Sequence, residues 1–205
     1  MSVLAHFLKW NLSLAEGETQ TTPAERDCLA KHAAGRECLA EIGVWHGVTT
    51  VRLRAAMSPS AVLYAIDPFP PGRLGFSMQR RIARGEVRSI RNGRIEWLRT
   101  TGFEAARTLA PLVGGKLEFL FIDGDHSYDG LKGDWEGWSG LIAPRGVVAL
   151  HDSRPTPTRP IDSAGSARYT AEVVLADHRF RVVDTVDSLT VVERIEATPV
   201  SQCDS

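Results

Sequence analysis

The sequence has few cysteines and almost no net charge. Its three cysteines, Cys28, Cys38 and Cys203, show neither the spacing of a metal site nor a paired disulfide framework. This usage is typical of a reducing compartment, so we expect a cytoplasmic protein. The 24 basic residues nearly balance the 25 acidic residues, which gives a formal net charge of −1. That balance argues against a general nucleic-acid binder.

Long apolar runs, internal repeats and low-complexity linkers are also missing. A short apolar run over residues 3–8 is interrupted by His6 and followed by Lys9, and no small-residue cleavage site comes after it. We therefore expect neither a signal peptide nor a membrane span. The sequence predicts an N-terminal helical extension over residues 1–21, which could cover a site or mediate a dimer contact, and a single domain over residues 22–205.

Strand-like and helix-like segments alternate through that domain. We expect strands over residues 38–42, 61–66, 95–98, 117–122, 147–150, 179–186 and 189–195. Helices are expected over residues 22–35, 49–57, 76–92, 102–112, 127–142 and 169–176. The first begins with a capping box of Thr22 and Glu25 and has Pro23 at its first position, and residues 143–146, with Pro144 and Gly146, are expected to end the fifth. The alternation predicts an α/β fold with a doubly wound, Rossmann-like sheet of seven strands, mostly parallel. Only Asp187 and Ser188 separate the last two strands, so these must form an antiparallel hairpin, because a parallel crossover needs about a dozen residues.

Acids and imidazoles follow two of the expected strands where each strand ends. Asp123, Asp125 and His126 come after the fourth strand, and His151 and Asp152 come after the fifth. The carboxyl ends of parallel strands form the edge at which open α/β sheets bind their ligands. The sequence therefore predicts a reaction site, a metal site, or both at this edge.

A glycine pair lies at the turn after the first strand. Gly43 allows a sharp turn and a close approach to a ligand, and Gly47 allows close helix packing. The pattern lacks the third glycine of a dinucleotide fingerprint. Asp67 ends the next strand, where a carboxylate can accept both hydroxyl protons of a ribose. The alternative for Asp67 is a cap or turn residue before Pro68.

In this order, the motifs resemble those of class I S-adenosylmethionine-dependent methyltransferases. The resemblance covers residues 22–194 and is closest to the metal-dependent small-molecule O-methyltransferases of the macrocin and catechol type. The motifs that carry it are Glu41-Ile-Gly with Gly47, Ile66-Asp67, the segment 121–128 and the segment 145–152. The expected terminal hairpin also matches the sheet of that family.

The resemblance implies a set of cofactor-binding residues. Gly43 and Gly47 would approach the methionine and adenosine portions of S-adenosylmethionine, and Glu41 would organise the turn. Asp67 would hold the ribose. Thr101 and Gly102, after the third strand, would lie near the adenine, and Asp123 would border the cofactor from the end of the fourth strand.

The resemblance also implies a divalent cation, magnesium or manganese, bound by Asp123, His151 and Asp152. Relatives have two acids, or Asp-Asn, at the last two positions. The histidine is a departure, since imidazole suits manganese, iron or zinc better than magnesium. Three arrangements stay open: Asp123 and Asp152 hold the ion with water, His151 joins them, or no ion binds.

Methyl transfer to a hydroxyl also needs a group that takes the hydroxyl proton. Asp125 and His126 are the candidates, with Asp125 preferred. Their alternatives are a cap of the following helix and a packed loop histidine. The expected function is therefore S-adenosylmethionine-dependent O-methylation of a small molecule, a sugar or a phenolic secondary metabolite. The rival hypotheses are a nicotinamide-dependent oxidoreductase and a non-catalytic nucleoside-binding module.

Overall fold

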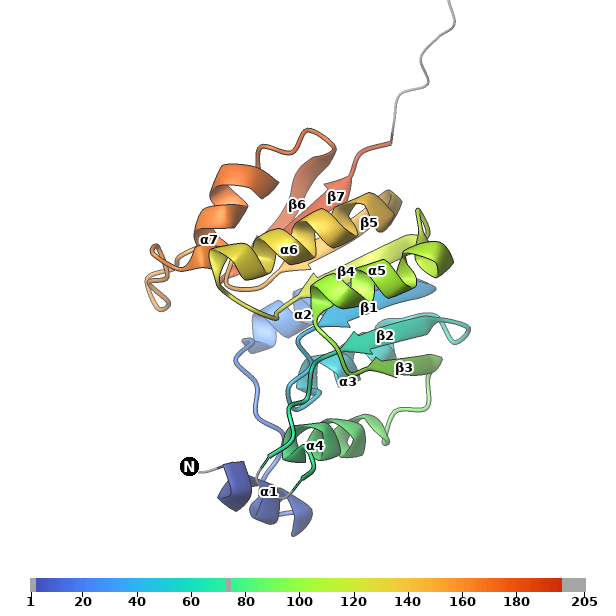
Figure 1. The fold of residues 1–205 in the computed structure, drawn as a ribbon, viewed down its shortest axis with the longest axis vertical. Helices are drawn as coiled ribbons and strands as arrows, with labels where there is room; N and C mark the ends of the chain where they lie inside the picture. Colours follow the sequence, from blue (N-terminus) through green and yellow to red (C-terminus); the bar gives the residue numbers. More distant parts are fainter. Residues whose placement is uncertain (1–2, 73–74, 197–205) are drawn as a thin grey trace, which may run out of the picture.

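The computed structural model describes residues 3–72 and 75–196, and its centre is one seven-stranded sheet (Figure 1). The strands are β1 (Cys38–Ile42), β2 (Val62–Ile66), β3 (Arg94–Leu98), β4 (Leu117–Ile122), β5 (Ile142–Leu150), β6 (Phe180–Val186) and β7 (Leu189–Arg194). Their order in the sheet is β3-β2-β1-β4-β5-β7-β6. Strands β1 to β5 are parallel, and β7 pairs antiparallel with both β5 and β6. The predicted fold class and the terminal hairpin are confirmed.

Helices cover both faces of this sheet. They are α1 (Val3–Asn11), α2 (Pro23–Ala33), α3 (Val48–Ala56), α4 (Met78–Val87), α5 (Gly102–Val113), α6 (Tyr128–Trp138) and α7 (Gly165–Tyr169). A 3-10 turn (Ser139–Leu141) follows α6, and a π turn (Thr170–Val174) follows α7. Helices α5 and α6 pack on one face, and α2 and α3 pack on the other (Figure 1). Helix α1 lies against α4.

The core explains why the inner strands are almost continuously apolar. Along β4, Leu120 and Ile122 face the layer of α5 and α6, whereas Phe119 and Phe121 face the layer of α2 and α3. A parallel strand that is buried on both faces needs apolar side chains at successive positions, not only at alternate ones. The strand ends, where polar residues begin, are therefore the places open to a ligand.

Several predicted starts and ends are correct in detail. Thr22 caps α2 in a capping box with Glu25, and Pro23 occupies the first turn. Other boundaries differ: α4 ends at Val87 and α6 at Trp138, five and four residues earlier than expected. Strand β5 begins at Ile142, because residues 143–146 extend the strand through an irregularity at which Arg145 has a φ of +61°. Helix α7 begins at Gly165, four residues earlier than expected, where the Ser166 N–H donates to the His126 carbonyl.

Two further findings concern the predictions on location. Cys28 and Cys38 are free thiols, and Cys203 lies outside the described residues. None of the helices within residues 3–72 and 75–196 combines the length and the apolar character that a membrane crossing requires. The division into an extension and a domain at residue 22 stays a prediction.

Candidate active site

A cavity of about 740 Å³ opens at the carboxyl ends of β1, β2 and β4. The strand order reverses between β1 and β4, which is the position at which open α/β sheets bind ligands. The volume lies within the range of small-molecule sites. Seven of the predicted site residues line this cavity: Gly43, Asp67, Thr101, Gly102, Asp123, Asp125 and His126. The other four, Glu41, Gly47, His151 and Asp152, are not among its lining residues.

Two glycines in the turn between β1 and α3 allow close packing against two different parts of the chain. Gly43 has a φ of +88°, and a Cβ atom on it would overlap the backbone carbonyl of Asp123. Gly47 has a φ of +78°, and a Cβ on it would lie 3.0 Å from the Cα of Ala83 in α4. The predicted roles in a sharp turn and in close helix packing are thus visible in the backbone.

Asp67 ties the end of β2 to the glycine turn. Its Oδ2 accepts the N–H groups of Val44, at 3.1 Å, and Trp45, at 3.0 Å. Its Oδ1 accepts the Phe69 N–H at 2.7 Å, which is the local turn considered as an alternative. A carboxylate offers about four lone-pair positions, so one position is left for a ligand in the cavity.

Thr101 and Gly102 begin α5 at the side of the cavity nearest β3. Thr101 caps the helix in a capping box with Glu104. Gly102 leaves no room for a side chain, because a Cβ atom would overlap the Asp134 carboxylate. Asp134, on α6, lines the cavity, and burial, followed by the charge of Asp125, raises its pKa to about 7.

Glu41 is fully buried in β1. Neither of its oxygens has a hydrogen-bond partner in the described part of the chain. Burial, together with the charges of Asp123 and Asp67, raises the pKa of Glu41 to about 8 against an opposing effect of the Thr50 hydroxyl. The carboxyl group is therefore neutral near pH 7. Its predicted role in organising the turn stays a prediction.

Both histidines of the predicted cluster contact the carboxylate of Asp123. Its Oδ1 lies 2.8 Å from His151 Nδ1 and 3.1 Å from His126 Nε2. Burial raises the pKa of Asp123, but the hydrogen bonds from His126 and His151 outweigh burial and hold the pKa below its usual range. One atom from each of these three residues lies within 4.8 Å of the others.

Each histidine meets a second carboxylate on its far side. His126 Nδ1 lies 3.1 Å from Asp152 Oδ2, and His151 Nε2 lies 3.4 Å from Glu25 Oε2. Hydrogen bonds to Asp123 and Asp152 raise the pKa of His126 to about 9. Burial lowers the pKa of His151, but its hydrogen bonds to Asp123 and Glu25 raise it to about 10. Without an ion, both rings are therefore cationic.

Asp152 is engaged by a cation that the sequence analysis did not identify. Its Oδ2 accepts from Arg159 Nη2 at 2.6 Å, and its Oδ1 lies 3.8 Å from His151 Nδ1. The guanidinium of Arg159 also donates to the backbone carbonyl and the side chain of Gln20, which lines the cavity. Its Oδ2 is thus engaged by Arg159 and His126, whereas its Oδ1 is buried without a hydrogen-bond partner in the described residues.

The donor set around Asp123 fits a transition-metal ion better than magnesium. Two imidazole nitrogens and one carboxylate oxygen converge, whereas magnesium prefers oxygen ligands. Metal-bound histidines usually donate their other N–H to a carboxylate, and Glu25 and Asp152 occupy those positions. The side chains that lie together are therefore Asp123, His126 and His151. Asp152 contacts the other nitrogen of His126, and its place in the predicted ligand set stays a prediction.

Asp125 is exposed at the mouth of the cavity. Its Oδ1 accepts the Ser127 N–H at 2.9 Å, and Ser127 itself caps α6 through a hydrogen bond from the Gly130 N–H. Asp125 is therefore a turn residue but not the helix cap. Within the described residues its Oδ2 accepts no hydrogen bond, so this oxygen can contact a ligand.

Sequence reasoning missed three residues that line this site or contact its side chains. Asp134 lies on the apolar face of α6 beside Leu131 and Trp135, and an acid on such a face was a usable signal. Glu25 was assigned only to the capping box, a role that it also fills through the Thr22 N–H. Arg159 lies in a loop without periodicity, and no pattern could have indicated its partner.

Residues 40–153 match a family model described as a methyltransferase domain. A curated protein of Sinorhizobium fredii, the uncharacterized protein y4gI, is 27% identical over 129 residues. This alignment covers 60% of the present chain but 14% of that protein, so the chain spans only a small part of its curated relative.

Two solved structures show a similar fold. A Corynebacterium glutamicum protein has a TM-score of 0.68 at 17% identity, with 96% of this chain and 91% of that chain covered. An O-methyltransferase from Bacillus cereus, in complex with SAH, has a TM-score of 0.59 at 15% identity, with 95% and 91% covered. At such low identities the likeness shows a shared fold.

Proposed function

The chain belongs to the methyltransferase domain family and is an S-adenosylmethionine-dependent methyltransferase, and we propose that it methylates a hydroxyl group of a small molecule. The observation that carries this proposal is the single cavity that joins the glycine turn and Asp67 to Asp123 and Asp125. At one end, the glycine turn and Asp67 can bind a nucleoside. At the other end, Asp125 can take up a proton, and Asp123 can help to bind a cation.

The cofactor end is built from backbone and one carboxylate. Asp67 holds the glycine turn through the N–H groups of Val44 and Trp45 and keeps one lone-pair position for a ribose hydroxyl. Gly43 lets the turn lie directly against the end of β4. Thr101 and Asp134 border the far end, where Asp134, with a pKa of about 7, can both donate to and accept from an adenine edge.

S-adenosylmethionine supplies a methyl group on a sulfonium sulfur, and the acceptor oxygen displaces that sulfur in line. Because the donor is already activated, the residues of this chain mainly hold the two partners in position. We assign the proton of the acceptor hydroxyl to Asp125, whose Oδ2 accepts no hydrogen bond within the described residues. His126 is less suited to this role, because Asp123 and Asp152 keep it protonated near pH 7 without an ion, and with an ion its ring would be a ligand.

A divalent cation at Asp123, His126 and His151 would lower the pKa of the acceptor hydroxyl and orient it. The chain prepares this position in two ways. Glu25 and Asp152 fix the orientation of the two rings, and Arg159 balances the charge of Asp152. We propose manganese rather than magnesium, since two of the three donors are nitrogen atoms.

A transfer assay tests the proposal. Purified protein is incubated with methyl-labelled S-adenosylmethionine and a panel of sugars, phenols, amines and thiols, and NADH binding is measured by calorimetry. We expect label on oxygen of a sugar or a phenol, and no NADH binding. Label on nitrogen or sulfur alone would overturn the acceptor class. NADH binding without methyl transfer would favour the oxidoreductase, and S-adenosylmethionine binding without any transfer would favour a binding module.

A further inference from the structure

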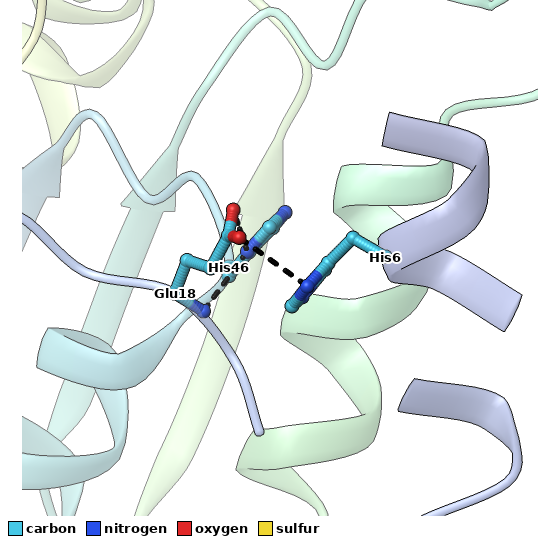
Figure 2. A group of neighbouring side chains, drawn as sticks. All are labelled: His6, Glu18 and His46. Atoms are coloured by element: carbon cyan, nitrogen blue, oxygen red, sulfur yellow. Dashed lines mark hydrogen bonds and ion pairs between the residues drawn. The ribbon is translucent and has the colours of Figure 1, made fainter. Parts of the chain in front are cut away.

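A second group of ionisable side chains lies where the N-terminal segment crosses the glycine turn. His6 belongs to α1, Glu18 to the segment between α1 and α2, and His46 to the turn between β1 and α3. Figure 2 shows the ring of His6 reaching from its helix toward Glu18 and His46. One nitrogen or oxygen of each residue lies within 4.8 Å of the others. His6 and His46 lie outside the lining of the cavity described above, and Glu18 lies at its edge.

The separations are close to those of ligands on one ion. His6 Nδ1 lies 3.3 Å from Glu18 Oε1, and His46 Nδ1 lies 3.9 Å from Glu18 Oε2. Zinc holds nitrogen and oxygen ligands at 2.0–2.2 Å, so two such ligands in a tetrahedral site lie about 3.4 Å apart. Rotation of these side chains would bring the three atoms onto one ion.

The buried ring of His6 independently indicates that a ligand binds here. The residue is only 4% exposed, and neither ring nitrogen has a hydrogen-bond partner in the described part of the chain. A buried polar atom without a partner costs free energy, and native structures rarely leave one unsatisfied. The Nδ1 of this ring points at a carboxylate that is half exposed, which leaves an open side for an ion and its water.

His46 already presents the form that binds metals. Its Nδ1 accepts the Glu18 N–H at 3.1 Å, so this nitrogen carries a lone pair rather than a proton. The two imidazole rings stack, with centroids 5.0 Å apart and planes 3° from parallel. An ion would replace the Glu18 N–H at His46 and would require the ring of His6 to turn out of the stack.

We propose that His6, Glu18 and His46 bind a divalent transition-metal ion of the zinc type, with water in the remaining position. Two imidazoles and one carboxylate are a common ligand set for such ions. The ion would connect α1 to the turn that shapes the cofactor cavity. It would also hold Glu18, Thr19 and Gln20, which line that cavity. The expected coupling, tighter S-adenosylmethionine binding in the presence of the ion, rests on the proposed function.

Cobalt provides the probe, because its visible absorption reports coordination directly. The full chain carries His126→Ala, so that the cluster at Asp123 does not contribute, and it is stripped with a chelator before Co²⁺ is added and then displaced with Zn²⁺. Two test variants are added to this background. His6→Phe keeps a stacked ring but removes its nitrogens, and Glu18→Gln keeps the size of the side chain. His178→Ala, at an exposed histidine, is the control.

We expect one Co²⁺ per chain in the background protein and in the control. Both test variants should bind at least tenfold more weakly. Equal binding in the test variants and the control would overturn the proposal. Thermal unfolding separates ion binding from folding. Without metal, His6→Phe should melt at or above the temperature of its parent, and added Zn²⁺ should raise the melting temperature of the parent and the control only.

An equal rise in the two test variants would also contradict the site. Calorimetry with S-adenosylmethionine separates this proposal from the proposed function. If no protein bound the cofactor while ion binding was intact, the proposed function would be wrong and the proposed metal site would still be supported.

Discussion

The Cα of Gly43 packs against the backbone carbonyl of Asp123, so closely that any side chain at Gly43 would overlap its oxygen. This contact fixes the glycine turn of β1 to the end of β4, and it sets the distance between the predicted cofactor groups and the acid cluster. A backbone oxygen cannot move aside as a flexible side chain can.

Gly43→Ala should therefore be strongly destabilising. We expect a loss of about 3 kcal/mol or more in the free energy of unfolding, since the overlap adds to the cost of a positive φ. Gly35→Ala is the matched control, because Gly35 has a φ of +70° with nothing near its missing Cβ. That variant should lose only about 1–2 kcal/mol. Denaturant unfolding measures both, and equal losses would contradict the packing argument.

Asp125→Asn should lower kcat by about 10²–10⁴-fold, the range typical of a lost general base. Its affinity for S-adenosylmethionine should not change, because Asp125 lies at the acceptor end of the cavity. Asp129→Asn is the control, since Asp129, in the first turn of α6, is also exposed and lines the same cavity. A similar loss of kcat in both variants would remove the special role of Asp125.

Metal removal should abolish turnover and leave cofactor binding nearly intact. Chelator-treated enzyme should regain activity with Mn²⁺ better than with Mg²⁺. Asp123→Asn should prevent the recovery of activity. Asp152→Asn should only weaken binding of the ion by about 10–100-fold, as expected for a residue that contacts a metal ligand. The assay is repeated in His6→Phe, so that the second proposed site cannot account for the result. Full activity after chelation would make the metal assignment wrong.

The raised pKa of Glu41 should make the free energy of unfolding depend on pH in an unusual direction. Its folded-state pKa is raised to about 8, while the unfolded chain ionises near its usual value of 4.5. Between these values the folded state holds one proton more, so this group makes stability fall as pH rises. The maximal slope is about 1.4 kcal/mol per pH unit.

Denaturant unfolding from pH 5 to pH 8 tests this relation. Glu41→Gln should remove that part of the slope, so that its stability relative to the natural chain improves steadily with pH. The exposed Glu136→Gln should follow the natural chain at every pH. Parallel curves for the natural chain and Glu41→Gln would show that Glu41 ionises normally in the folded state.

The predictable parts of the molecule were those that depend on local chemistry and periodicity. The span of β4, the capping box at Thr22 and the antiparallel pairing of the last two strands all follow from short segments. The residues after β1, β2 and β4 could be grouped, because parallel strands end at one edge.

The partners that bridge distant segments were not predictable. Arg159, in an aperiodic loop, contacts Asp152. Glu25, in helix α2 near the start of the chain, contacts His151. These contacts decide which groups surround the candidate ion, so the ligand set could not be fixed from sequence. The start of β5 was missed for a related reason, since its first residues continue through a strand irregularity that Pro144 and Gly146 made look like a turn.

The most direct test of the central claim is a calorimetric titration of S-adenosylmethionine into the natural chain and into Asp67→Ala. We predict micromolar binding to the natural chain and a loss of about 1–3 kcal/mol in the variant, the cost of leaving polar groups unpaired. Absence of binding, or equal affinity in the two proteins, would contradict the claim that Asp67 and the glycine turn hold the ribose of the cofactor.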